Sequence, residues 1–113
     1  MAVFRLFFSN RTSDNERVEE LQAQLRDRLP NMPFENLARY VPDSPDWKDH
    51  AASHIKSCDG LICVVGPSSW ESEPIDWEIR QAHQLKKPLL VTRLSDDYGL
   101  PPACRDLSLD VCD

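Results

Sequence analysis

One uninterrupted apolar run between two glycines, Gly60-Leu-Ile-Cys-Val-Val-Gly66, constrains the fold of this chain more than any other feature. The run is long enough for a β-strand and too short for a helix. Such a strand is buried on both faces, which indicates a parallel sheet covered by helices, because half-solvated antiparallel strands alternate apolar and polar residues. An amphipathic helix over about 75–87 and a second apolar strand, Pro88-Leu-Leu-Val-Thr92, complete a βαβ unit.

The rest of the chain alternates strand and helix signals. The predicted elements are a strand at 3–8, a helix at 14–29 with a capping box at Ser13 and Glu16, a weakly patterned strand within 34–41, a helix N-capped by Ser44 that ends before Asp59, and an edge strand at 107–111. We therefore predict a single domain over residues 1–113 with an α/β, flavodoxin-like, doubly wound fold. Its mostly parallel sheet of about five strands is expected in the order 2-1-3-4-5, with helices on both faces.

Composition excludes several classes of protein. The net charge of −6 argues against a nucleic-acid partner or an anionic membrane surface, both of which need a basic field. No apolar run reaches the length of a membrane span, and the first residues lack the pattern of a signal peptide, so we expect a cytoplasmic protein. The four cysteines have no C-x-x-C spacing and are expected to be reduced thiols.

Glu78 breaks the pattern of its helix. On a helical wheel it falls roughly 60° from Ile75, inside the stripe formed by Ile75, Ile79, Ala82 and Leu85. A carboxylate on the buried side of a helix is unfavourable unless specific contacts hold it. Either Glu78 serves a function at the carboxyl edge of the sheet, or it leans to solvent at the margin of the stripe and favours the helix dipole.

The predicted strand order places a crevice between the first and third strands, where open α/β sheets bind ligands. The loops that leave these strands, 9–14 and 67–74, are expected to form its opposite walls, with Glu78 at the floor. Ser9, Asn10 and Arg11 would then face the acidic residue from one wall, and Ser68 would lie in the other.

Other motifs are weaker. His50 and His54 have a spacing that can bind a metal on a helix, but no third ligand stands at a fixed offset, so we expect no metal. No glycine-rich phosphate loop occurs, and Ser68 lacks the glycine frame of a nucleophile elbow. Trp77 falls on the side of its helix away from the buried stripe, where it would either mark an interface or fold back over a neighbouring loop.

Three segments resemble Toll/interleukin receptor (TIR) domains. Phe4-Arg-Leu-Phe-Phe-Ser-Asn-Arg11 resembles their opening strand, and the segment 47–67 resembles their second helix and third strand. The segment 72–82 followed by Lys86-Lys-Pro-Leu-Leu-Val91 is most similar to the compact bacterial and archaeal TIR-like branch, which includes TIR proteins of Thoeris anti-phage defence. The resemblance covers roughly residues 3–94. The family has the flavodoxin-like fold that the hydrophobic pattern predicts.

The resemblance implies a function for the singled-out glutamate. Enzymatic members of the family need a glutamate early in the helix after the third strand to cleave NAD at the nicotinamide–ribose bond, and Glu78 stands at the matching position. Ser9 and Arg11 would face the ribose and pyrophosphate, and Trp47 matches an aromatic position near the nucleotide pocket. We thus predict Glu78 as catalytic, with substrate-binding residues Ser9, Asn10, Arg11, Trp47 and Ser68. NAD would be the substrate, and no cofactor is expected.

Alternatives remain open from the sequence alone. An NAD-cleaving enzyme could make an ADP-ribose-derived signal for a partner effector in bacterial anti-phage defence, and TIR-like contacts predict self-association. The same fold also serves non-catalytic interaction or nucleotide-sensing modules, which the poor match near residues 42–45 favours. A nucleoside deoxyribosyltransferase-like enzyme is a third reading, because it shares the fold and a carboxylate-assisted glycosidic step. A short tail after residue 94 suggests a reduced fifth strand and last helix.

Overall fold

The computed structural model describes residues 3–112 and has a parallel sheet in the order β2-β1-β3-β4-β5. The strands are β1 (Phe4–Ser9), β2 (Phe34–Asn36), β3 (Gly60–Val65), β4 (Leu89–Arg93) and β5 (Val111–Cys112). The helices are α1 (Asn15–Arg28), α2 (Trp47–Ser57), α3 (Glu73–Gln84) and α4 (Pro102–Asp106). The predicted flavodoxin-like α/β fold and its strand order are confirmed.

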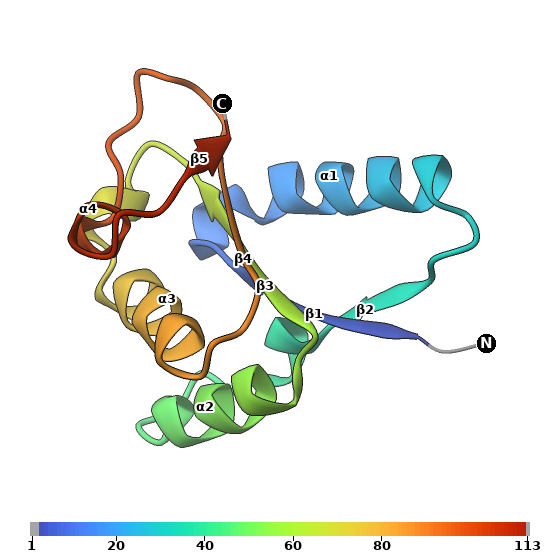
Figure 1. Cartoon of the computed structure of the whole chain (residues 1–113), viewed down its shortest axis with the longest axis horizontal. Helices are drawn as coiled ribbons and strands as arrows, with labels where there is room; N and C mark the ends of the chain where they lie inside the picture. The colour runs from blue at the N-terminus through green and yellow to red at the C-terminus, as the bar shows by residue number, and fades with distance from the viewer. Residues whose placement is uncertain (1–2, 113) are drawn as a thin grey trace.

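The sheet separates two layers of unequal size. Helix α1 covers one face alone, and α2, α3 and α4 pack on the other (Figure 1). Within residues 3–112, the α2–α3–α4 side buries a cluster of fourteen residues, whereas the α1 side buries Phe8, Val18 and Val64 as a cluster of three. Because burial of apolar surface is the main favourable term in folding, most of the stabilisation lies on the α2–α3–α4 side.

The βαβ unit forms as the sequence predicts and fixes the centre of the fold. Ser72 is the N-cap of α3 and accepts a hydrogen bond from the Ile75 amide at 3.3 Å, with a proline in the first turn. Ile75, Ile79 and Ala82 form the buried stripe against the sheet. Helix α3 therefore starts two residues before the predicted boundary and presents the predicted face.

Two predicted helix caps are wrong. Thr12–Asp14 forms a 3-10 turn, and α1 begins at Asn15 with Asp14 as N-cap. The predicted capping box between the described residues Ser13 and Glu16 therefore does not form. Helix α2 begins at Trp47 with Asp46 as N-cap, and Ser44 lies outside it. In both places a preceding turn takes up the residues that carry the cap-like pattern.

The second and fifth strands are shorter than predicted. Strand β2 ends at Asn36, and Leu37–Tyr40 turns into a 3-10 helix because Asn36 accepts a hydrogen bond from the Ala38 amide. The predicted edge strand at 107–111 is wrong for all but its last residue. Its alternation arises because Leu107, Leu109 and Val111 each pack on the larger core, while the preceding residues form the unpredicted helix α4.

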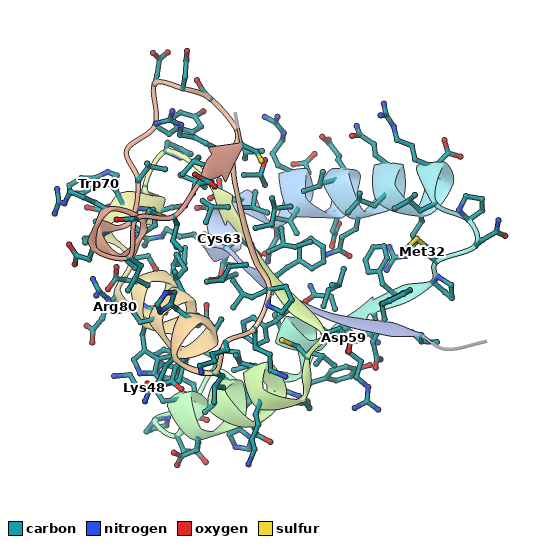
Figure 2. The ribbon with its side chains drawn as sticks, in the orientation of Figure 1. Met32, Lys48, Asp59, Cys63, Trp70 and Arg80 are labelled. Carbon is teal, nitrogen blue, oxygen red and sulfur yellow. The ribbon has the colours of Figure 1, made fainter. Side chains whose placement is uncertain are left out.

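A carboxylate ties α3 to α4. Asp76 Oδ1 accepts a hydrogen bond from the Ala103 amide at 2.7 Å, in the first turn of α4, and Asp76 Oδ2 pairs with Arg80 Nε at 2.8 Å. Arg80 extends away from the sheet to Asp106, 2.7 Å from its Oδ2 (Figure 2). Asp76 thus supplies from another helix the capping acceptor that α4 needs at its N-terminus.

Replacing Asp76 with alanine is expected to lower the free energy of unfolding by about 1–2 kcal/mol, because the Ala103 amide loses its acceptor. Arg80→Ala is the matched control, since it removes only ion pairs of a side chain that is 41% exposed and should cost less. Urea unfolding of both variants measures the difference. An Arg80 variant as unstable as the Asp76 variant would show that the ion pairs, not the cap, hold α4.

Among residues 3–112, no helix has the length and apolar character needed to cross a membrane.

Candidate active site

Helix α3 brings Glu78 to the end of β1. Ser9, the last residue of β1, donates its hydroxyl to Glu78 Oε1 at 2.7 Å. Ser9 is 1% exposed and lies beside Cys63 in the pairing of β1 with β3. The carboxylate therefore sits at the switch point of the sheet, as the strand order predicts, and it is held there by a specific donor.

The surroundings of Glu78 change its ionisation. Burial raises the pKa of this carboxyl to about 7, and the hydrogen bond from Ser9 partly opposes the rise. Near neutral pH the group is thus divided between its acid and its carboxylate. A pKa raised by burial in a cleft is typical of functional carboxyls.

The neighbouring thiol is a poor nucleophile. Cys63 is fully buried in the middle of the molecule (Figure 2), and burial, with smaller effects from Cys104 and Glu78, raises the pKa of its thiol well above the usual range. A thiol reacts as its thiolate, so Cys63 serves as apolar filling under Glu78. Cys63 therefore supplies no nucleophile to this site.

A cleft of about 800 Å³ opens beside Glu78. It runs from α1, where Val18 and Gln22 line it, across the end of β1 to the segment 36–43, Trp47 and α3. A volume of this size is in the range of small-molecule and cofactor sites. A second hollow of about 340 Å³ adjoins it and shares Asn10, Thr12 and Pro74.

The predicted walls of the crevice are correct only in part. The loops 9–14 and 67–74 enclose the smaller hollow, because Arg11 crosses between them and lies 3.2 Å from the carbonyl oxygen of Ser68 and 3.7 Å from Glu71. The larger cleft, which contains Glu78, instead has the segment 36–43 and Trp47 as its second wall. Of the described loop 67–74, Pro74 alone lines this cleft.

The predicted site residues take different places around these hollows. Asn10 lines both, and its Nδ2 donates to the Arg11 carbonyl and to Asn15 Oδ1, each at 2.8 Å. Trp47 lines the large cleft, and Arg11 lines the small hollow. Ser9 lies behind Glu78. The described residues that line the two hollows do not include Ser68, which contributes its carbonyl oxygen to Arg11.

Trp77 supports the aromatic wall of the cleft. Its ring meets that of Trp47 edge-on at 5.4 Å between centroids, and Lys48 Nζ lies 5.8 Å from each ring. Trp77 is half-buried, so it folds back onto α2, and the exposed-interface reading is wrong. Trp77 thus packs behind Trp47, which lines the cleft.

The histidines of α2 have local partners. His50 Nε2 lies 3.3 Å from Asp46 Oδ2, and the His54 ring is 6.0 Å from the Tyr40 ring. Within residues 3–112, no group of three or more histidine, cysteine, aspartate and glutamate side chains is placed to hold a metal ion.

Sequence reasoning missed the α1 side of the cleft and Asn36. Gln22 is 9% exposed and, like Asn15 and Asn36, presents a carboxamide to the cleft. The amphipathic pattern of α1 gives no sign that its polar residue at 22 is buried. Asn36 had a usable signal, since asparagine before a short turn often accepts from the amide two residues on, as it does here from Ala38.

Replacing Ser9 with alanine is expected to raise the pKa of Glu78 further, because the hydroxyl stabilises the ionised form. If a reaction at this site needs the ionised form of Glu78, the rise of its rate with pH should shift to higher pH by about one pH unit. The variant would then be slow at pH 7 and recover at pH 9. A rate that stays low at every pH would instead mean that Ser9 acts on substrate or structure directly.

The comparisons with known proteins agree with this fold. A family model described as "Thoeris protein ThsB, TIR-like domain" matches residues 7–98. The TIR domain of the Toll-related receptor TRR-2 from Hydra magnipapillata is similar in structure, with a TM-score of 0.69, 11% identity, and coverage of 94% of this chain and 82% of that chain. No match was found among curated proteins.

Two further solved structures are similar. The CMP N-glycosidase BcmB of Clostridium botulinum has a TM-score of 0.61 and 22% identity, and the match covers 95% of this chain and 84% of that chain. The TIR domains of the activated Roq1 resistosome, which recognises the pathogen effector XopQ, have a TM-score of 0.60 and 12% identity, with coverage of 95% and 64%. At these identities the solved structures establish the fold alone. The predicted TIR-like character is confirmed by the family match and this fold.

Proposed function

Since the chain belongs to the TIR-like domain family of Thoeris protein ThsB, we propose that it is an enzyme that cleaves the nicotinamide–ribose bond of NAD. The observation that carries the proposal is the Glu78 carboxyl, held at 2.7 Å by Ser9 on the edge of a large cleft at the switch point of the sheet. Glu78 is the catalytic residue in this proposal. NAD is the substrate, and the reaction uses no cofactor.

The chemistry suits a single carboxylate. Cleavage breaks the bond between C1′ of the ribose and the nicotinamide nitrogen. The electron pair of that bond stays on the nitrogen, so nicotinamide leaves as a neutral molecule. Positive charge then develops on the ribose, and an ionised Glu78 stabilises it more than it stabilises the ground state. Water completes the reaction by adding to C1′ and releasing a proton, or a nucleophilic atom of the ADP-ribose itself closes a ring.

The rest of the cleft suits the flat base and the polar sugar–phosphate part of a nucleotide. Trp47 offers a flat apolar wall next to Glu78, and Asn10 offers a carboxamide at the junction of the two hollows. Arg11 projects into the smaller hollow as a candidate for the pyrophosphate, for which guanidinium is a suitable partner. Ser68 has a supporting role through its carbonyl oxygen.

The family suggests the setting of the reaction. We propose that the product is an ADP-ribose-derived signal, made in the cytoplasm and read by an effector protein in bacterial anti-phage defence. Self-association through TIR-like contacts would complete or regulate the site. The Roq1 TIR domains belong to a resistosome, which supports assembly as a property of this fold.

A second candidate is cleavage of the N-glycosidic bond of a nucleoside monophosphate. The likeness to a CMP N-glycosidase favours it, since that protein is named for such a reaction and 84% of its chain is covered. The same carboxylate chemistry would serve both reactions, because each develops positive charge on a ribose. The deoxyribosyltransferase-like alternative would reveal itself by exchange of bases between nucleosides.

The experiment is incubation of the purified protein, dilute and concentrated, with NAD and separately with CMP, followed by chromatography and mass spectrometry. Nicotinamide release that Glu78→Gln abolishes supports the proposed enzyme, and the mass and mobility of the second product distinguish hydrolysis from cyclisation. Release of cytosine alone would favour the second candidate. Turnover of neither substrate at any concentration would favour a non-catalytic binding module.

A further inference from the structure

Asn36 occupies an unusual position at the end of β2, the three-residue edge strand next to β1. Strand β2 stops at Asn36, opposite Leu6 of β1, whereas β1 continues to Ser9. The end of β1 thus runs beyond its neighbour, and its outer edge would be unpaired. Asn36 fills this gap, because its Oδ1 accepts the Phe8 amide at 3.2 Å.

The same oxygen also accepts the Ala38 amide, at 3.0 Å. Two backbone N–H donors on one side-chain atom identify that atom as the oxygen, so the orientation of the amide is fixed. The Asn36 Nδ2 atom has no hydrogen-bond partner among residues 3–112, and the side chain lines the large cleft. Asn36 therefore presents two N–H groups in a fixed direction without an acceptor.

These donors line the same cleft as the carboxylate. Phe8, whose amide Asn36 holds, directly precedes Ser9, whose hydroxyl holds Glu78. Asn36 and Glu78 both line the large cleft, so the carboxamide and the carboxylate can contact one bound molecule. The exposed charges of the cleft do not select a ligand, because Glu19 and Asp43 line it together with Arg26 and Arg39.

We propose that Asn36 is a substrate-positioning residue that donates a hydrogen bond to an oxygen of the ribose–phosphate part of the nucleotide. This inference rests on the proposed function of Glu78. A neutral donor beside the carboxylate complements it: Glu78 accepts from hydroxyl groups, whereas Asn36 needs an acceptor, and the sugar and phosphate oxygens are the acceptors nearest the bond that breaks. The contact persists after the base has left, so it holds the sugar in both states.

The test is Asn36→Asp, which keeps an oxygen for both backbone amides and removes the two donors. We expect an unchanged melting temperature, a KM for NAD raised about tenfold or more, and a smaller change in kcat, since one hydrogen bond made equally in the ground and transition states is lost. Asn31→Asp, an exposed residue in the turn before β2, adds the same charge as a matched control. Asn36→Ala should lose stability as well, because both amides lose their acceptor.

An unchanged KM in Asn36→Asp, with an active wild type, would overturn this inference and leave the proposed function intact. A wild type that releases no nicotinamide would count against the proposed function, and the role of Asn36 would then be decided by calorimetric titration with ADP-ribose. Binding about tenfold weaker in Asn36→Asp supports the inference. Equal affinity, or no binding to the wild type, overturns it.

Discussion

Glu78→Gln is expected to lower the rate of NAD cleavage by about 10³-fold or more while the protein stays folded. Glutamine matches glutamate in shape and can still accept the hydrogen bond from Ser9, so the change removes charge and little else. The loss of one group that stabilises developing charge in a cleft typically costs this much. Nicotinamide release under saturating NAD measures it.

The same variant is expected to gain stability at alkaline pH. The pKa of Glu78 is about 7 in the folded protein against about 4.5 for an ordinary glutamate, so the folded state binds the proton more tightly. The free energy of unfolding of the wild type should therefore fall as the pH rises from about 4.5 to about 7 and level off above, a loss of up to about 3 kcal/mol from this group. Glutamine has no such loss.

Chemical unfolding of both proteins at pH 4.5 and pH 8 checks this. The two stability curves should meet near pH 4.5 and separate above it, with the glutamine variant higher. Asp59→Asn is a suitable control, because Asp59 is exposed at the opposite end of β3 (Figure 2). Curves that stay parallel would show that Glu78 ionises normally, and a glutamine variant that still releases nicotinamide would remove it from the mechanism.

Gly66→Ala is expected to lower the free energy of unfolding by about 3 kcal/mol. A Cβ at this position would overlap the carboxylate of Asp14, which is buried at the start of α1. Overpacking at buried sites costs about 1–3 kcal/mol, and here a charged group would have to move. Asp14 Oδ2 is buried without a hydrogen-bond partner among the described residues. Urea unfolding measures the change.

Two comparisons isolate the cause. Gly60→Ala should cost much less, because a Cβ there meets its nearest atom, the Pro88 carbonyl oxygen, at an ordinary 3.5 Å. Asp14→Ala should relieve the overlap, so the double variant should be more stable than Gly66→Ala alone. If Asp14→Ala fails to rescue, backbone conformation rather than the carboxylate makes Gly66 necessary.

The fold was predictable where burial leaves a strong pattern. The run at 60–66 is apolar because β3 has helices on both faces, and this alone indicates a parallel sheet. The pattern failed where elements are very short. Strand β2 and strand β5 have three and two residues, so their sequences reflect packing of the following turns and loops more than a strand period.

The candidate site was predictable in proportion to how strongly each residue breaks a pattern. Glu78 interrupts an apolar stripe, so the sequence alone singles it out. Asn36 and Gln22 sit in polar surroundings in the sequence and become notable only when the end of β2 and the face of α1 form one cleft. Ser68 was predicted as a site residue because its loop follows β3. In the structure its carbonyl oxygen accepts a hydrogen bond from Arg11 instead.

The unequal layers on the two sides of the sheet have a consequence for motion. Helix α1 is held by the small cluster around Phe8, Val18 and Val64, so it is the layer with the least apolar contact to lose on opening. Its amides should exchange with solvent sooner than those of α3. Because α1 is also one wall of the large cleft, a molecule bound there would slow that exchange, and affinity would include the free energy of ordering this wall.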